Sequence, residues 1–384
     1  MRFPEFTKEW EMASLQDIAA VNPKSNPLQN SFVYIDLEAV EKGELRKIQE
    51  VMREEAPSRA QRVIYKNDIL FQCVRPYQKN NYIHKIQSKS NQQWVASTGY
   101  AQIRTTEIPN YIYHLLNTDG FNRKVMVRCT GSSYPAINSE DLATIRFYLT
   151  TDTKEQLKIS RLLDLLDERI ATQNKIIEDL KKLKSAISKQ VFAQEPNGWC
   201  RLDTLFSKGK AGGTPTSTNK EYYNGEIPFL SINDITKQGK YVRYTENHLS
   251  QSGLENSSAW VVPKYSLIMS MYASVGLVTI NEIPTTTSQA MFAMQLKDKG
   301  LLDYLYYYLS YFKYRYIHKY LETGTQSNIN ADIIRGIMIP IYGHSRNMEI
   351  ASTLQGIDVK IDNELSVLKL FNKQKNYLLS QMFI

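Results

Sequence analysis

Cysteine is scarce in this sequence. Cys73, Cys129 and Cys200 are the only cysteines among 384 residues, far apart in the chain and odd in number. A disulfide framework and a cysteine-rich zinc site therefore find no support. The five histidines form no H-x-x-x-H or H-E-x-x-H pair, so we expect no metal site.

Motifs for nucleotide binding and catalysis are missing as well. No G-x-x-x-x-G-K-[ST] occurs, because residues 208–214 are rich in glycine but lack that spacing. No G-x-G-x-x-G opens a helix, and the Asn/Asp-Pro-Pro-aromatic tetrapeptide of amino-methyltransferases does not appear. We therefore expect a chain that is not an enzyme, with no catalytic residue and no cofactor of its own.

Long apolar runs are absent too. The longest candidate, residues 266–280, is interrupted by Ser, Tyr and Gly, which argues against a membrane span. The first residues, Met-Arg-Phe-Pro-Glu-Phe, contain no apolar region of a signal peptide. We expect a cytoplasmic protein with no membrane partner.

The composition is that of a globular protein. Hydrophobic residues make up 42% and charged residues 22%, which excludes wholesale disorder. The length suffices for two or three domains of about 150 residues each. The formal net charge of +8 is a weak indication of nucleic-acid binding, because many metabolic enzymes are equally basic.

The chain contains an internal repeat. Shifted by 191 positions, residues 159–192 align with residues 350–383 without a gap, and eight of the 34 aligned pairs are identical. Both segments space their apolar residues by alternating steps of four and three, the pattern of a coiled-coil seam. The predicted seam residues are Ile159, Leu163, Leu166, Ile170, Ile177, Leu180, Ile187, Ile350, Leu354, Ile357, Ile361, Leu368, Phe371 and Leu378.

Each repeated segment predicts one long helix. A helix of 36 to 40 residues is about 54 to 60 Å long, and packing of its apolar stripe supplies most of its stability. We expect the two helices to form an antiparallel intramolecular coiled coil, with separate bundling or dimerisation as the alternative. Polar residues interrupt both seams, and Leu183 and Leu365 are expected to fill in partly there. Thr153 is a candidate N-cap, with Gln156 completing a capping box.

The segments before the helices also correspond, more faintly. Residues 10–15 resemble residues 199–204, and residues 65–71 resemble residues 263–269, where a Lys precedes a strand-like apolar run. Two tyrosine-rich segments, 110–116 and 303–309, are predicted to be helices. The tyrosines of residues 304–320 are expected to pack, with their hydroxyls at the rim, rather than to stack on bases. The predicted fold class is therefore α+β, with two globular domains separated by two long helices and related by pseudo-two-fold symmetry.

The predicted boundaries follow from this plan. They are residues 1–152 for the first globular domain, 153–195 for the central helix, 196–344 for the second globular domain and 345–384 for the C-terminal helix.

Two regions have the composition of a nucleic-acid surface. Residues 208–216 place two cations, glycines and hydroxyls in one predicted loop, suited to phosphates or base edges. Residues 75–81 combine cations, amides and an aromatic side chain at a predicted strand end. An ordinary solvated loop is the alternative for both. Together with the matched segments 131–138 and 324–330, these regions give the candidate DNA contacts Arg75, Tyr77, Lys79, Ser132, Ser133, Lys208, Lys210, Thr214, Thr216, Gln326 and Asn328, and Tyr272 is a further candidate.

The residues of the repeat resemble those of a known family, the specificity subunits of type I restriction–modification systems. Nearly the whole chain takes part in the resemblance, and the combination is more specific than any one piece. The segments that carry it are residues 159–170 and 180–192 (similar to the family's central repeat), 377–384 (its closing repeat), 2–6 with Trp10, and 212–216 with 222–229.

The resemblance implies a DNA sequence-recognition subunit. Each globular domain would be a target-recognition domain that reads one half of a bipartite, asymmetric sequence. The helices would set the spacer and dock two methyltransferase subunits. S-adenosylmethionine, ATP and Mg are expected on partner subunits, the last two with the restriction and translocase subunits. Alternatives are a coiled-coil scaffold that binds only proteins, and a self-contained modification enzyme, which lacks a methyltransferase motif here.

Overall fold

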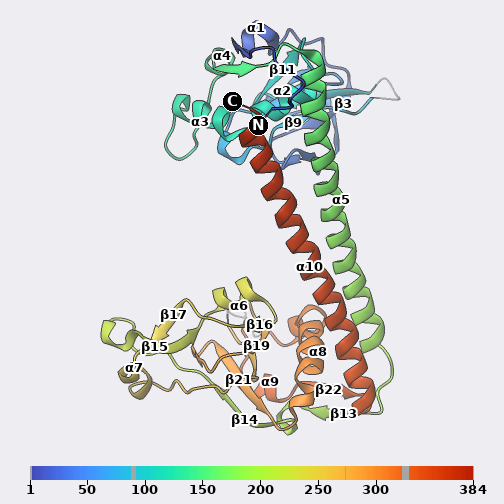
Figure 1. The fold of residues 1–384 in the computed structure, drawn as a ribbon. Coiled ribbons are helices and arrows are strands. Elements are labelled where there is room, and N and C mark those ends of the chain that lie inside the picture. The colour runs from blue at the N-terminus through green and yellow to red at the C-terminus, as the bar shows by residue number, and fades with distance from the viewer. Residues whose placement is uncertain (1, 88–91, 273, 322–327, 384) are drawn as a thin grey trace. The chain divides into compact units, whose positions relative to one another are not determined.

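A computed structural model describes residues 2–87, 92–272, 274–321 and 328–383. The chain divides into two compact units, Met1–Lys175 with Leu365–Ile384, and Ile176–Glu364. Each unit contains one globular domain and one half of each long helix, α5 (Thr153–Phe192) and α10 (His344–Met382) (Figure 1). No helix within the described residues combines the length and the apolarity that a bilayer crossing needs.

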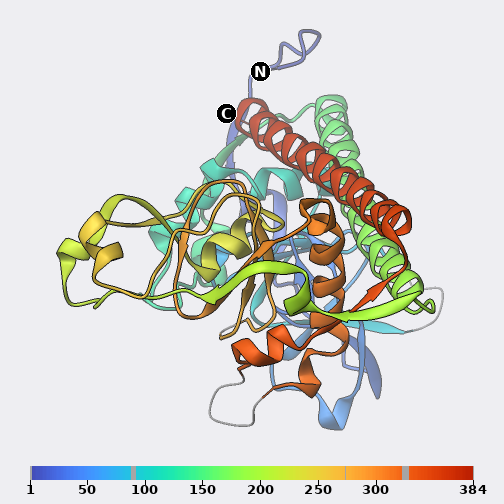
Figure 2. The same cartoon turned by 90° about the horizontal axis from the view of Figure 1, so that it is seen from below.

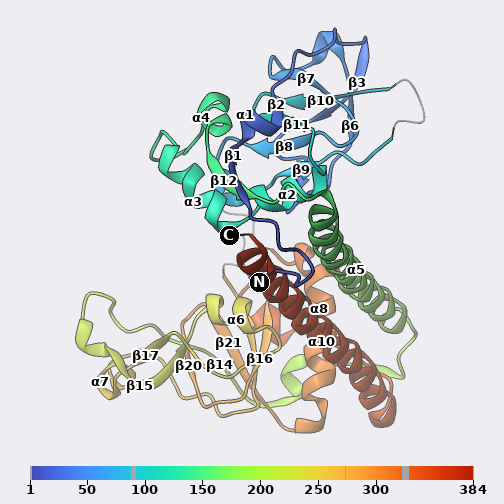
Figure 3. The same ribbon diagram turned by 45° about the horizontal axis from the view of Figure 1, so that its top comes forward.

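The first globular domain is built on two four-stranded sheets, ordered β6-β3-β10-β7 and β2-β11-β8-β9 (Figure 3). Neighbouring strands are antiparallel except for the parallel pair β3 and β10. The strands are β2 (Ala19–Val21), β3 (Ser31–Ile35), β6 (Gln49–Met52), β7 (Ala60–Ile64), β8 (Ile69–Gln72), β9 (Tyr82–Ile83), β10 (Gln93–Ser97) and β11 (Tyr100–Thr105).

Shorter elements complete this domain. Strand β1 (Glu11–Ser14) pairs with β12 (Arg146–Leu149), and β4 (Val40–Glu41) pairs with β5 (Glu44–Leu45). The helices are α1 (Leu15–Ile18), α2 (Pro109–Leu116), α3 (Asp119–Arg128) and α4 (Ser139–Ala143). Helix α2 buries most of its length against β8 and β11, and Ile112 and Leu116 of this helix join Ile69 and Ile103 of the strands in one core.

The second globular domain has a five-stranded sheet, β14-β21-β18-β19-β16, and a three-stranded sheet, β17-β15-β20. A further pair joins β13 (Gly198–Arg201) to β22 (Met338–Ile341). The other strands are β14 (Phe206–Ala211), β15 (Tyr223–Leu230), β16 (Tyr241–Val242), β17 (Asn247–Leu249), β18 (Leu267–Ser270), β19 (Val278–Asn281), β20 (Thr286–Thr287) and β21 (Met291–Leu296). The helices are α6 (Ile232–Gln238), α7 (Gln251–Glu255), α8 (Leu302–Arg315) and α9 (Ala331–Arg335).

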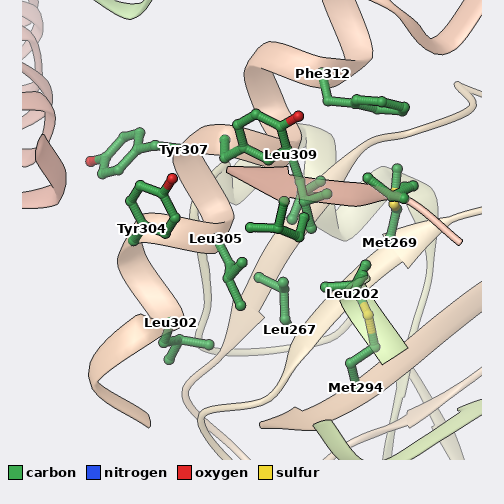
Figure 4. Packing of buried hydrophobic residues seen from close by; sticks show 14 of the residues in the cluster. Leu202, Leu267, Met269, Met294, Leu302, Tyr304, Leu305, Tyr307, Leu309 and Phe312 are labelled. Carbon is green, nitrogen blue, oxygen red and sulfur yellow. The ribbon is translucent and has the colours of Figure 1, made fainter. Parts of the chain in front are cut away.

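The core of the second domain lies between α8 and the five-stranded sheet. Leu305 and Leu309 of the helix point toward Leu267 and Met269 of β18 (Figure 4). Tyr307 points away from these strands on the other side of α8. The apolar 3.6-residue period of α8 thus faces a sheet whose central strands are buried throughout.

The two globular domains share one topology. The order β2-β11-β8-β9 matches β14-β21-β18-β19 strand for strand, and the parallel pair β3/β10 matches β15/β20. The turns match as well: Asn67 and Tyr265 both have a positive φ, 75° and 63°, and their N–H groups donate to the carbonyls of His84 (2.7 Å) and Asn281 (2.6 Å). The predicted duplication therefore extends to strands and turns whose sequences differ.

The long helices pack side by side and antiparallel (Figure 2). In the first unit, Asp167 of α5 pairs with Lys375 of α10, and Arg169, one half-turn further along α5, lies over the ring of Phe371, one turn earlier in α10. In the second unit, the remaining halves of the helices meet, and Ile350 and Leu354 of α10 share a core with Phe192 of α5. The α+β class with two long helices is thus confirmed. None of the fourteen predicted seam residues is exposed.

Two cross-helix ion pairs involve Lys184 and Lys375, which occupy one of the two polar positions in each seam. Lys184 lies 2.5 Å from Asp358 in the second unit, and Lys375 lies 2.5 Å from Asp167 in the first. The two ion pairs are equivalent, because Asp358 and Lys375 are the counterparts of Asp167 and Lys184 in the repeat. Each pair joins the aspartate of one copy to the lysine of the other. The expectation that Leu183 and Leu365 fill the seam was wrong: both point outward and are 48% and 42% exposed.

Candidate nucleic-acid interface

In the second domain, the cations of residues 208–216 lie on a strand rather than on a loop. Lys208 and Lys210 belong to β14, an edge strand paired only with β21, so the predicted loop begins only after Ala211. The ammonium of Lys208 lies 4.2 Å from the ring centre of Trp260. The ammonium of Lys210 lies 3.4 Å from the carbonyl oxygen of Ser258. Both side chains remain exposed, so their charges stay available to an anionic partner.

Gly212 and Gly213 serve close packing and not flexibility. A Cβ atom at Gly212 would lie 2.0 Å from the carbonyl oxygen of Thr287, and one at Gly213 would lie 2.5 Å from the backbone nitrogen of Ala259. The glycines therefore allow the backbone after β14 to pass against two other segments. The predicted contact Thr214 is exposed next to them, and its hydroxyl donates to the side-chain oxygen of Gln289.

The other predicted contacts of the second domain are spread more widely. Thr216 is exposed, and Tyr272, just after β18, is 41% exposed. Asn328 is half-buried and lies near Tyr272, because the N–H of the next residue, Ile329, donates to the carbonyl of Met271 at 3.1 Å. Gln326 lies outside the described residues.

In the first domain, the structure brings Arg75 to the segment that contains Ser132 and Ser133. The guanidinium of Arg75 lies 4.4 Å from the ring centre of Tyr134, and the backbone N–H of Arg75 donates to the carbonyl of Pro135 at 2.8 Å. Both serines are exposed. The same arrangement relates Asn328 to Tyr272 in the second domain, so each domain joins the end of one core strand to the segment before α4 or α9.

Tyr77 lies in the short 3-10 turn Pro76–Gln78, and Lys79 directly follows it. Arg75 and Lys79 flank this turn with positive φ values of 54° and 52°, a strained backbone that is common at functional sites. Tyr77 is 51% exposed. The ammonium of Lys79, however, lies 2.6 Å from Asp119 and 3.1 Å from the carbonyl of Asn117, so its charge is compensated within the domain. The hydrogen bond from Lys79 lowers the pKa of Asp119.

Sequence reasoning missed the partners of the helix charges. Asp167 and Asp358 each pair with a lysine of the other long helix. The signal was present in the repeat, since Asp167/Asp358 and Lys184/Lys375 are two of its eight identical pairs.

These features define a class before any relative is considered. The protein carries two copies of one α+β domain on a pair of long helices, with exposed cations on each domain. Across the described ranges, no three His, Cys, Asp or Glu side chains stand together as a metal site would need. Such a chain belongs to the class of proteins that bind a partner molecule through the exposed surfaces of their domains.

Comparison with known families makes the assignment specific. The model of the type I restriction modification DNA specificity domain matches residues 7–182 and again residues 196–368. These two matches cover most of the sequence, so the chain belongs to this family and carries two copies of its domain.

The curated relatives are distant in sequence, and they are also specificity subunits of type I restriction enzymes. The chain is 26% identical over 178 residues to the type I restriction enzyme MjaIX specificity subunit of Methanocaldococcus jannaschii, covering 45% of this chain and 40% of that protein. It is 21% identical over 356 residues to the HindI specificity subunit of Haemophilus influenzae, covering 71% of this chain and 76% of that one. The chain thus spans less than half of the first relative and about three quarters of the second.

Solved structures share the fold. A chain from a type I R-M system, studied for complex assembly and conformational transition, superposes with a TM-score of 0.63 at 21% identity over 97% of both chains. The S subunit of the type I system of M. genitalium gives a TM-score of 0.59 at 14% identity, over 98% of this chain and 96% of that one.

Proposed function

We propose that this chain is the DNA sequence-recognition subunit of a type I restriction–modification complex and has no catalytic activity of its own. The observation that carries the proposal is the double match to the DNA specificity domain, on two globular domains of one topology. Each domain reads one half of a bipartite target. Because the side chains at matching places differ, the two half-sites differ as well, and the target is asymmetric.

The long helices dock two methyltransferase subunits. Their outer faces support this role, because large apolar side chains remain exposed there, including Leu157, Leu165, Leu370 and Tyr377. In this proposal the methyltransferase subunits bind S-adenosylmethionine and methylate adenine. Restriction and translocase subunits bring ATP and Mg, and the complex acts on double-stranded DNA in the cytoplasm.

The experiment is to express the chain with its methyltransferase subunits in a host without adenine methylation and to map modified adenines across the genome. We expect one bipartite, asymmetric motif with a fixed spacer. A palindromic motif would contradict the unlike half-sites. Absence of any sequence-selective methylation or binding would favour a scaffold that binds only proteins, and S-adenosylmethionine binding by the purified chain would favour an enzyme.

A further inference from the structure

The first domain contains a hollow that the candidate contacts do not explain. Its volume is about 360 Å³, and it lies among the segment after β2, the end of β7, residues 84–87 and the start of β10. We propose that this hollow is a base-reading site of the first domain and that Gln29 and Gln92 recognise adenine there. The inference rests on the proposed function and names the chemistry by which one domain carries it out.

The side chains around the hollow are rich in amides. Asn26, Gln29, Gln87, Gln92 and Gln93 line it, and none of the described lining residues is a carboxylate. An amide offers a donor and an acceptor together, which match the N7 acceptor and the N6 amino group of adenine in the major groove. A wall without carboxylates also avoids repulsion of the DNA phosphates.

Two of the amides, those of Gln93 and Asn26, are held in place by hydrogen bonds within the domain. The side chain of Gln93 accepts a hydrogen bond from the N–H of Gln29 (3.0 Å) and donates to the carbonyl of Pro27 (3.1 Å), which fixes the segment after β2. Asn26 donates to the hydroxyl of Tyr65 at 2.6 Å. Within the described residues, the side-chain amides of Gln29 and Gln92 make no hydrogen bond to the protein, so they are the two that a base edge would engage.

Aromatic rings and one cation complete the site. Trp94 and His84 form the floor, with ring centres 4.9 Å apart, and both are buried. Tyr65 forms part of the rim, under the guanidinium of Arg104 at 4.9 Å. Lys66 is exposed beside it and is suited to a phosphate. Flat apolar surface, amides and a single lysine together fit a base pair with its phosphate better than a charged small molecule.

The same place in the second domain carries different chemistry. The segment after β14, the counterpart of β2, carries Thr214 and Thr216, whereas the segment after β2 carries Asn26 and Gln29. Both domains keep a lysine, Lys66 or Lys264, directly before the matching positive-φ turn residue. A shared phosphate contact with unlike base contacts is what two domains that read different half-sites would need.

The test uses the complex of the full chain with its methyltransferase subunits and duplexes of the motif mapped for the wild type. The double variant Gln29→Ala with Gln92→Ala should lose about tenfold or more in affinity for the motif. Replacing one adenine of a half-site by 7-deazaadenine removes its N7 acceptor; it should cost the wild type a similar factor and cost the variant nothing further. Specificity in the other half-site should not change.

Two more variants sharpen the result. Gln29→Glu keeps the shape but presents only acceptors, so adenine preference should fall and cytosine, with its N4 donor, should be favoured. Gln49→Ala, an exposed amide on β6 outside the hollow, is the matched control and should bind like the wild type. Equal thermal unfolding of all variants separates recognition from folding.

The outcomes distinguish failure of the proposed reading site from failure of the proposed function. A wild-type complex that selects a bipartite motif, together with a double variant of unchanged affinity and unchanged response to 7-deazaadenine, overturns the reading site and leaves the proposed function standing. A wild-type complex without sequence selectivity overturns the proposed function itself.

Discussion

At the scale of single residues, three buried tyrosine hydroxyls of α8 find hydrogen-bond acceptors inside their own unit. The hydroxyl of Tyr308 donates to the carbonyl of Met338 at 2.9 Å, that of Tyr307 donates to Asp358 at 2.8 Å, and that of Tyr304 donates to the carbonyl of Pro340. Burial raises the pKa of all three, so they stay protonated donors. The prediction that the tyrosines of residues 304–320 pack is confirmed for these three, whereas Tyr314 and Tyr320 are 83% and 43% exposed.

His84 should make the first domain sensitive to acid. Burial lowers its pKa to about 4, against the attraction of Asp68, whereas an unfolded histidine titrates near 6.5. Between these values the unfolded chain binds the extra proton. Stability is therefore complete above about pH 6.5 and falls as the pH drops toward 4, by about 3 kcal/mol at most.

Urea unfolding at pH 7 and pH 4.5 checks this expectation. His84→Gln should lose less stability between the two pH values than the wild type, while the exposed control His318→Gln should behave like the wild type. Equal losses for His84→Gln and wild type would mean that His84 does not titrate in this range.

Lys208 and Lys210 should contribute affinity that does not depend on DNA sequence. Each lysine that contacts a phosphate adds about one unit to the slope of log K against log salt concentration, so replacing both by Ala should reduce the slope by about 2. Binding measured from 50 to 200 mM salt tests this, with the exposed Lys299→Ala as control. An unchanged slope would place β14 away from DNA.

At the scale of elements, local hydrogen bonds decide where α5 begins. The side chain of Asp152 caps α5 by accepting from the N–H groups of Lys154 (2.8 Å) and Glu155 (3.3 Å). The predicted cap of Thr153 with Gln156 was wrong, because Gln156 is buried and its amide donates to the carbonyl of Thr150 at 2.8 Å. The spacing of the repeat predicts the helix, and the side chain of Asp152 sets the residue at which it begins.

The cross-helix ion pairs should hold the register of α5 and α10. Asp167→Lys places two cations opposite each other and should destabilise the first unit by about 1 kcal/mol, a modest value because both groups are partly exposed. Adding Lys375→Asp restores an ion pair with the charges exchanged and should recover most of the loss. Thermal unfolding of the single and double variants measures the coupling.

Lys182 provides the control for this experiment. Its partner Asp179 lies on the same helix and both are well exposed, so Lys182→Ala should change the midpoint little. A double variant no more stable than Asp167→Lys alone would show that the pair contributes nothing across the helices.

At the scale of the whole molecule, the chain is a tandem repeat whose copies share a fold more than a sequence. Trp10 and Tyr111 of the first unit pack on Phe383 at the end of α10. In the second unit, Tyr304 packs on Phe192 at the end of α5. Phe192 and Phe383 are counterparts in the repeat, so each globular domain is anchored to the end of the helix that the other copy contributes.

The expected role of the long helices in setting the spacer predicts the effect of shortening both helices together. Deleting the matched heptads 174–180 and 365–371 removes about 10 Å from each helix, which corresponds to about three base pairs of DNA. We expect both half-sites to stay unchanged and the spacer between them to shorten. Methylation mapping of the variant complex checks this, and an unaltered spacer would show that the helices do not set it.

The sequence alone sufficed for features that depend on local periodicity. The 4,3 spacing of Ile159, Leu163 and Leu166 predicts a helix with one apolar face whatever surrounds it, and the offset of 191 reveals the second copy. The α+β class and the matching strands within residues 65–71 and 263–269 follow from the same kind of local pattern.

Only the tertiary structure decided which surfaces are available. The pairing of Lys79 with Asp119, the place of Lys208 on an edge strand and the amide-lined hollow around Gln29 all depend on segments that are distant in the chain. Local composition shows that a lysine or an amide is present. Whether its charge is compensated, or its donors are left for DNA, depends on contacts that form only when the chain folds.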